Sequence, residues 1–387
     1  MSKKRSSISN IGYVNSIRDN LLDIKTKRLL PMYEDLKSAN CVVCSGSGRS
    51  LYSLNAAMSQ IALSQIGWRN KVVLTPDDPG FPGKDMYDAA PELERRYKKT
   101  LLLITSGSGL SEDPLVMAQD LAKYIEDKKS PRFSMGLVTS NLNSPLAKIV
   151  NEHGHVIELK GRGASKPSFE YSKIGILGDI FELGSLTLFC MMTEAIFRNL
   201  PAEGVLELCE EEFTKLGPII DSNAGSETYS KLVDAMERRT NIFLGGRGTA
   251  NEIVKMTAVR LFHIKSFLGD NVYIARGVNT PRPRAGDLEI LLSFSGETKP
   301  VIMWCDIFKK LKGEVMAITG TPDSTLCKKC DCHITLEETV KLGQPRRFYM
   351  RAAYVLSPLP VKLAERLSER GLKLPEYVMN WYHSVTQ

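Results

Sequence analysis

Short apolar runs alternate along the chain with longer stretches of helical periodicity. In the first part of the chain the apolar runs lie at 41–44, 72–74, 101–104, 135–150 and 155–159. Continuous runs of this kind are typical of strands in a parallel sheet whose two faces are both covered by helices. Helical patterns cover 13–38, 51–66 and 114–126. This order predicts a strand–loop–helix fold.

The second part of the chain repeats the order of the first. Its apolar runs begin at 241, 272, 288 and 314, and its helical patterns cover 202–238, 252–267 and 301–311. Gly46 and Ser106 are 60 positions apart, and Gly246 and Ser293 are 47 apart. We attribute the difference to a charged surface insertion after the second strand of the first half. The repeat predicts two three-layer α/β/α sandwiches with flavodoxin-like parallel sheets, related by internal duplication.

The same comparison gives the expected division of the chain. We expect an N-terminal tail and a helix that packs on the first unit, two α/β units joined by helices, and a helical C-terminal segment. The corresponding ranges are 1–39, 40–200, 201–240, 241–345 and 346–387.

Small hydroxyl residues follow the predicted strands. In an open parallel sheet, ligands bind beyond the carboxyl ends of the strands, where helix N-termini present free N–H groups. Loops of Gly, Ser and Thr at that place predict a phosphate site. The first half supplies Ser45, Ser47, Arg49, Ser50, Ser106, Ser108 and Ser111. The second half supplies Gly246, Gly248, Thr249, Ser293, Ser295 and Thr298.

Composition narrows the possible partners and the compartment. The chain has 51 Lys and Arg against 44 Asp and Glu, spread without a basic cluster. This diffuse excess of +7 favours anionic small ligands and does not predict a nucleic-acid partner. We see no apolar run near the ~20 residues of a membrane helix, and no secretory signal at the start. Most of the eight cysteines lie in apolar runs, as in a cytoplasmic protein.

The sequence predicts neither a metal nor a nucleotide cofactor. Cys327, Cys330, Cys332 and His333 are crowded into "CKKCDCH". Zinc sites usually draw on two Cys/His pairs that a spacer separates, and we find no second pair. The Gly-rich segments "GSGRS" and "GGRGTA" match neither the dinucleotide fingerprint nor a Walker motif.

These loops carry a family resemblance. "LSFSGETKPV" resembles the "SxSGxT" loop with which sugar isomerase (SIS) domains bind phosphosugars, and "TSGSGLSED" is a looser copy with Leu110 and Ser111 in place of Glu and Thr. The stretches "TSNLNSPLAKI", "HVIEL", "GDIFEL" and "RLFHI" are similar to 6-phospho-3-hexuloisomerase. The tandem arrangement also resembles the archaeal phosphoglucose/phosphomannose isomerases. The resemblance covers about 40–345.

The resemblance implies a base and an acid. In this family the isomerisation passes through a cis-enediol, and the family's basic glutamate matches Glu182, three residues after Asp179. The histidine of the hexuloisomerase helix matches His263, whose side chain titrates near working pH. Tyr349 takes the place of the glutamate in the second half, and the first half has Leu63 and Ser64 where the second has its histidine.

We therefore expect one working site per chain, where the halves meet. The first-half loop and Glu182 would form it, with His263 reaching in from the second half. Arg49 either adds charge to the phosphate site or is an ordinary surface arginine. The second loop is catalytic itself, regulatory or vestigial.

The resulting expectation is a cytoplasmic, metal-independent hexose 6-phosphate isomerase like 6-phospho-3-hexuloisomerase. Two alternatives stay open: a phosphoglucose/phosphomannose isomerase, and a non-catalytic phosphosugar-binding regulatory protein. A homodimer is possible, and neither nucleic acid nor a membrane is an expected partner.

Overall fold

The computed structural model describes residues 5–63, 71–162, 175, 176, 178–275, 277, 279–341, 343–375 and 378. Two parallel five-stranded sheets dominate it, in the orders β2-β1-β3-β4-β5 and β10-β9-β8-β6-β7. The first sheet contains β1 (Cys41–Gly46), β2 (Val72–Leu74), β3 (Thr100–Thr105), β4 (Phe133–Thr139) and β5 (Gly154–Glu158). The second contains β6 (Ile242–Gly246), β7 (Val272–Ile274), β8 (Leu288–Ser293), β9 (Glu314–Thr319) and β10 (Cys332–Thr335).

Helices cover both faces of both sheets, which confirms the predicted fold class. In the first half these are α1 (Gly12–Leu22), α2 (Thr26–Ser38), α3 (Arg49–Leu63), α4 (Met86–Arg96), α5 (Glu112–Lys128), α6 (Pro145–His153) and α8 (Asp179–Phe197). They are followed by α9 (Glu203–Ala224), α10 (Glu227–Glu237), α11 (Thr249–Phe267), α12 (Lys299–Lys310), α13 (Thr325–Lys329), α14 (Phe348–Leu356) and α15 (Pro358–Glu369).

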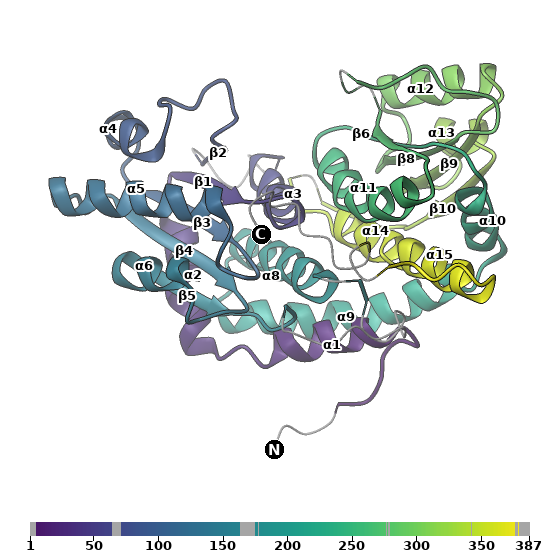
Figure 1. Cartoon of the computed structure of the whole chain (residues 1–387). Helices are drawn as coiled ribbons and strands as arrows, with labels where there is room; N and C mark the ends of the chain where they lie inside the picture. Colours follow the sequence, from purple (N-terminus) through teal and green to yellow (C-terminus); the bar gives the residue numbers. More distant parts are fainter. Residues whose placement is uncertain are drawn as a thin grey trace.

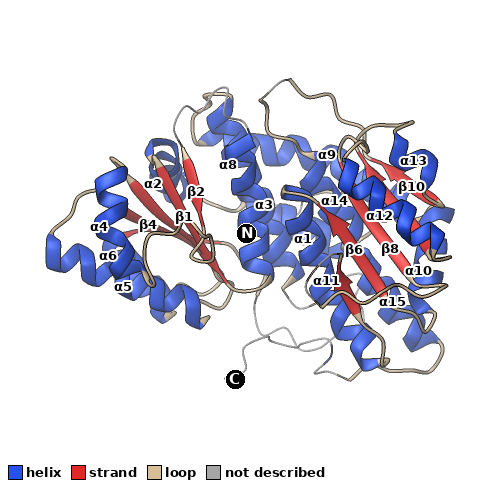
Figure 2. Cartoon of the chain, turned by 90° about the horizontal axis from the view of Figure 1, so that it is seen from above, coloured by secondary structure: helices blue, strands red, loops and turns tan. Residues whose placement is uncertain are grey.

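The inner faces of the two sheets share one hydrophobic core. The outer face of the first sheet packs on α4, α5 and α6, and that of the second sheet packs on α12 and α13, each in a separate cluster. The inner faces pack on a single large cluster that draws on α1, α3, α8, α9, α11 and α14. Helices α3, α8 and α14 accordingly lie between the two sheets (Figure 1, Figure 2). This layer brings α3, α8 and α11 together, and all three helices carry candidate site residues.

Three predicted elements differ from the observed ones. The helical pattern 13–38 is two helices, because the chain turns between α1 and α2, and 202–238 is likewise split into α9 and α10. The run 135–150, predicted as a strand, is β4 followed by α6. Ser144 caps this helix by accepting a hydrogen bond from the backbone N–H of Ala147, and Pro145 occupies its first position. The charged insertion contains a helix of its own, α4.

A lysine caps the helix before each sheet. The Nζ of Lys71 donates to the last backbone carbonyls of α2 at 2.5 to 2.8 Å. The Nζ of Lys265 donates to the carbonyl oxygens of Met236 and Arg238, both at 2.8 Å, at the end of α10. An ammonium at this place satisfies carbonyls that have no partner within the helix. The two lysines stand at different places in the two halves, Lys71 just before β2 and Lys265 within α11.

One described helix, α8, is long and apolar enough to cross a membrane by composition. Nearly nine-tenths of it is buried between the two sheets, as expected for a helix in the hydrophobic core of a protein. The two acids in its first turn, Asp179 and Glu182, are also buried. Their burial makes α8 the first place to look for a functional site.

Candidate functional site

The two Ser/Thr loops have the same internal geometry. In the first, the hydroxyls of Ser106 and Ser111 lie 3.2 Å apart at the N-terminus of α5. In the second, the hydroxyls of Ser293 and Thr298 lie 3.1 Å apart at the N-terminus of α12. The middle serine of each loop accepts a backbone N–H two residues on, at 3.2 Å in both cases. Each loop is therefore a preformed ring of donors at the carboxyl end of a strand.

Each loop contains one position, Gly109 or Gly296, that only glycine can occupy without strain. Gly109 and Gly296 have φ values of 66° and 63°, in the left-handed region. A Cβ at either position would also collide with the hydroxyl of a serine that caps the helix after the following strand, Ser144 of α6 or Ser324 of α13. The tight turn therefore depends both on backbone freedom and on space.

We expect Gly109→Ala to lower the free energy of unfolding by about 1–3 kcal/mol, because it adds a collision to left-handed strain. Denaturant titration measures this. Gly48→Ala is the matched control, since Gly48 also has a positive φ (54°) but no atom within 4 Å of the added Cβ. Equal losses for the two variants would contradict the collision.

Glu182 lies buried where the first loop meets α3. Its side chain is 4% exposed. The Ser50 hydroxyl donates to its Oε1 at 3.1 Å, and its Oε2 has no hydrogen-bond partner among the described residues. Burial raises the pKa of Glu182, against the opposing effect of Arg49, Arg162, the Ser50 hydrogen bond and Arg260. Buried polar atoms are rarely unpaired, so the free oxygen marks a place where a ligand group fits.

An ion-pair cluster lies beside this glutamate. Arg49 Nη1 is 2.5 Å from Asp179 Oδ1, and Arg260 Nε is 3.6 Å from the same oxygen. The N–H of Ile176 donates to Asp179 Oδ2 at 2.7 Å. Burial and the neighbouring Arg49 lower the pKa of Arg260 to about 9, against the raising effect of Asp179 and Glu182. Arg49 is thus part of a buried cluster and not a surface arginine.

Arg162 connects the cluster to the first loop. A Cβ on Gly107 would collide with the Arg162 side chain and lie 3.1 Å from the ring of Phe181, the residue before Glu182. The backbone N–H of Arg162 donates to the Ser140 hydroxyl at 3.2 Å. With Arg49 and Arg260, three arginines surround two carboxylates, so the cluster has an excess positive charge that suits an anionic ligand.

The structure places the other predicted residues as follows. Ser45 is buried at the end of β1, and Ser47 and Ser108 are half-buried in the loops. Gly246 ends β6, and Gly248 has a positive φ like its counterpart Gly48. Ser295 is exposed. Ser64 lies outside the described residues.

His263 belongs to the same face of α11 as Arg260, one helical turn further on. Its ring is 1% exposed and packs edge-on against Phe262, with the ring centroids 6.5 Å apart. The structure therefore brings Ser50, Arg49, Asp179, Arg260 and Glu182 into one cluster, with His263 on the helix that supplies Arg260.

The second loop has a site of different charge. Helices α3 and α11 begin 200 residues apart, at Arg49 and Thr249. Matching Glu182 with Tyr349 sets an offset of 167 residues between α8 and the segment around the start of α14. Both carboxylates of the first cluster, and its arginines Arg49 and Arg260, are replaced in the second. The corresponding pairs are Arg49 with Thr249, Arg260 with Gln60, Asp179 with Arg346 and Glu182 with Tyr349.

Contacts in the second site support this correspondence. The Gln60 side chain accepts the backbone N–H of Arg346 at 2.9 Å and donates to its backbone oxygen at 2.7 Å, whereas Arg260 contacts the side chain of Asp179. The Arg346 guanidinium stacks 4.2 Å above the ring of Phe294, inside the loop. Burial raises the pKa of Tyr349, with Arg346 opposing it. The second site has a cation and a phenol but no carboxylate at the place of Glu182.

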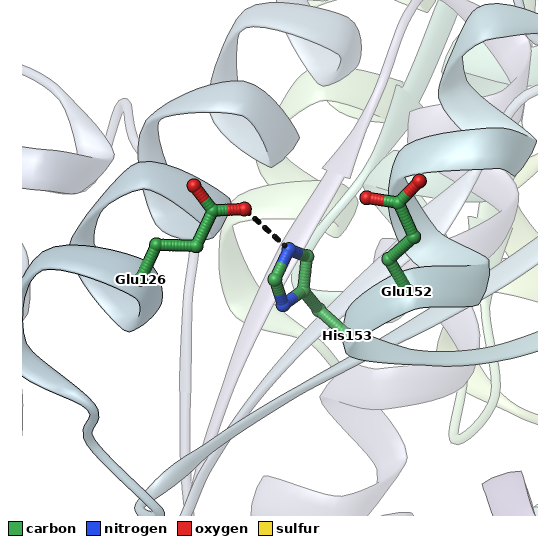
Figure 3. Close-up of side chains that lie close together, drawn as sticks. All are labelled: Glu126, Glu152 and His153. Carbon is green, nitrogen blue, oxygen red and sulfur yellow. Dashed lines mark ion pairs between the residues drawn. The ribbon is translucent and has the colours of Figure 1, made fainter.

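Among the described residues, one cluster of possible metal ligands lies away from these loops. Glu126, Glu152 and His153 bring ligand atoms within 4.8 Å of one another, with His153 Nε2 3.3 Å from Glu126 Oε1 (Figure 3). They lie toward the C-terminal ends of α5 and α6, at the opposite end of the sheet from the loops. The Cys327 thiol lies 3.2 Å from the hydroxyls of Thr319 and Ser324, inside the fold.

Sequence reasoning missed Arg162 and Arg260 as site residues. Arg260 is in the quoted stretch "RLFHI", one turn before His263, and a charged residue on the buried face of a helix is itself a signal. Arg162 follows the first sheet in "KGRG" and has no local pattern that distinguishes it. Only the fold brings it to the loop.

Comparison with known proteins places the chain in a family. The sequence profile described as "SIS domain" matches residues 236–345. An uncharacterized protein of Archaeoglobus fulgidus is 31% identical over 136 residues, 35% of this chain and 70% of that protein. The chain belongs to the SIS domain proteins. The SIS profile covers β6 to β10, and the first half repeats the same strand order.

Other SIS relatives match over part of their length. The 3-hexulose-6-phosphate isomerase of Bacillus subtilis is 34% identical over 116 residues, 30% of this chain. The chain spans 60% of that relative and 56% of an uncharacterized Methanothermobacter thermautotrophicus protein that is 35% identical over 120 residues, 31% of this chain.

Solved structures match the whole arrangement. Tagatose-6-phosphate ketose/aldose isomerase from Escherichia coli has a TM-score of 0.55 at 11% identity and covers 93% of this chain and 96% of its own. Glucosamine-6-phosphate deaminase from Thermotoga maritima has a TM-score of 0.53 at 14% identity, with coverages of 93% and 94%. At these identities the likeness shows the shared tandem fold.

Proposed function

We propose that this SIS protein is a phosphosugar isomerase that interconverts hexose 6-phosphates by proton transfer through a cis-enediol, as in 6-phospho-3-hexuloisomerase. The observation that carries the proposal is the Glu182 carboxylate. It is buried, one oxygen is held by Ser50 and the other is free of hydrogen bonds among the described residues. A carboxylate with a raised pKa and a free lone pair suits a base that moves a proton between adjacent carbons.

The surroundings of Glu182 supply the remaining requirements. Ser106, Ser108 and Ser111 would hold the phosphate at the N-terminus of α5. Arg162 lies against this loop and adds positive charge on the side that faces Glu182. His263 is the candidate for moving oxygen-bound protons or opening a sugar ring. No residue of this set requires a metal or a nucleotide.

A panel of hexose phosphates tests the proposal. Each sugar is incubated with the protein in deuterated water. NMR then follows the exchange of the proton on the carbon next to the carbonyl. Conversion of 3-hexulose 6-phosphate supports the hexuloisomerase assignment, and conversion of glucose or mannose 6-phosphate alone supports the alternative isomerase. Binding without exchange or conversion for every sugar overturns the enzyme proposal.

A non-catalytic phosphosugar-binding protein is the second candidate. The second site favours it, because the loop of Ser293, Ser295 and Thr298 is intact while Tyr349 stands where a base would be needed. In that case both loops would bind sugar phosphate and neither would convert it.

Loop substitutions separate the roles of the two halves. We expect Ser106→Ala to lower kcat/KM about 10-fold or more, since it removes a hydrogen bond to a charged phosphate. Ser293→Ala should have a much smaller effect on turnover. Steady-state kinetics on the converted sugar measure both. A reversed order would place the working site at the second loop.

A further inference from the structure

The second half contributes an arginine to the first-half site. Arg260 is on α11, yet its Nε lies 3.6 Å from Asp179 Oδ1 on α8. A Cβ on Gly178 would have Arg260 Nη2 at 3.1 Å and Glu182 Oε1 at 3.5 Å, so the guanidinium and the carboxylate both lie close to this glycine. Gly178 leaves this space open. The arginine is 8% exposed, so solvent screens its charge only weakly.

We propose that Arg260 is a positioning residue through which the second half keeps the first-half base, Glu182, ionised and in place. It acts by its charge on Glu182 and by sharing Asp179 with Arg49. The inference rests on the proposed function for the role of Glu182 as the base, and it goes beyond that function by assigning a task to the other half of the chain.

The effect of Arg260 on Glu182 can be separated from the effects of the other charged groups around this carboxylate. A carboxylate taken out of water tends to become neutral unless cations face it. Arg49 and Ser50 are fixed on α3, within the same half, and Arg162 follows β5, also in the same half. Arg260 is the described cation that comes from across the interface. The groups around the cluster are Arg49 and Ser50 on α3, Arg162 after β5, Asp179 on α8, Arg260 and His263 on α11, and Tyr13 on α1, which faces Asp179.

The second site provides an internal comparison. Gln60, the counterpart of Arg260, is neutral, and the residue it contacts is Arg346 instead of an aspartate. The arginine is thus absent at the site that has Tyr349 and no base. An arginine at the Arg260 position and a carboxylate at the Glu182 position occur together in the first site and are both replaced in the second, by Gln60 and Tyr349, as expected if the arginine serves the carboxylate.

Infrared difference spectroscopy against pH tests the proposal directly. The C=O band of protonated Glu182 is identified as the band that is missing in Glu182→Gln. The pH at which half of this band has disappeared, the titration midpoint of Glu182, is then measured in the wild type and in Arg260→Gln. We expect the midpoint to rise by about one pH unit or more, as for the loss of a weakly screened charge at close range. Arg260→Lys should restore most of the shift. Arg239→Gln, which removes an exposed arginine elsewhere on the surface, should leave the midpoint unchanged.

A folded Arg260→Gln variant with the wild-type midpoint would overturn the proposal. If this variant does not fold, Arg260→Met, which retains a long side chain in the buried space, is titrated and judged by the same criterion. The infrared titration of Glu182 does not require that the protein turn over a substrate. A failure of the isomerase proposal is therefore detected independently, by the panel of hexose phosphates. Where turnover is present, the acidic limb of kcat/KM should move upward by the same amount as the midpoint.

Discussion

Replacing Glu182 by Gln is expected to reduce turnover about 10²-fold or more while sugar phosphate still binds. Acid–base catalysis by a positioned side chain contributes about 10²–10⁴-fold, and the amide retains the shape of the carboxylate but cannot accept a proton from carbon. The phosphate loop is untouched by the change. Steady-state kinetics give the loss, and calorimetric titration with the converted sugar phosphate gives the retained affinity.

The stability of the variant provides the control. Burial raises the folded-state pKa of Glu182 above its unfolded value, so the folded state binds the extra proton. The free energy of unfolding then falls as pH rises from the unfolded pKa through the folded one. Gln does not ionise, so we expect Glu182→Gln to be at least as stable as the wild type at neutral pH. A variant that loses activity because it unfolds would contradict the role of the carboxylate.

Replacing Glu212 by Ala should give the largest loss of stability, about 3–5 kcal/mol in the free energy of unfolding. Glu212 is fully buried on α9 and accepts hydrogen bonds from Arg347 Nη1 at 2.7 Å and from Arg351 Nε and Nη2 at 2.6 and 2.9 Å. Arg347 is the N-cap of α14, and Arg351 lies within this helix. Truncating the acid leaves two buried guanidinium groups partly unpaired, although Glu194 still holds Arg347. Urea titration measures the change.

Glu211 is the matched control for this prediction. It is the preceding residue of α9, and its main partner is Lys215, 2.7 Å away on the surface. Exposed pairs contribute about 0–1 kcal/mol, so Glu211→Ala should cost far less than Glu212→Ala. Similar losses for both would mean that the buried network does not hold α14 in place.

The duplicated fold could be predicted because both halves keep the same order of apolar runs and loops. Boundaries were less predictable where one pattern covered two elements. The run 135–150 has apolar residues at both ends, and the polar stretch that leads to the cap at Ser144 and Pro145 separates its strand from its helix. The turn between α1 and α2 has no glycine or proline to mark it.

The candidate site was predictable as far as its residues follow local motifs. Ser106 and Ser293 stand at strand ends, and Glu182 is an acid in an apolar helix. The contributions of Arg162 and Arg260 depend on how α11 packs against α8, which a linear pattern does not contain. Arg346 stands in the second site where Asp179 stands in the first. This match could be recognised only from the contacts in the structure, because they show which helices of the two halves correspond.

The shared inner core has a consequence for the history of the chain. Because one hydrophobic cluster serves the inner faces of both sheets, neither half can fold with a complete core of its own. The two halves should therefore unfold in a single cooperative transition. Selection for folding then acts on every helix of the central layer, whatever its chemistry. The second half, with Arg346 and Tyr349 where the first has its carboxylates, is then still required for the shared core, whichever ligand its loop binds.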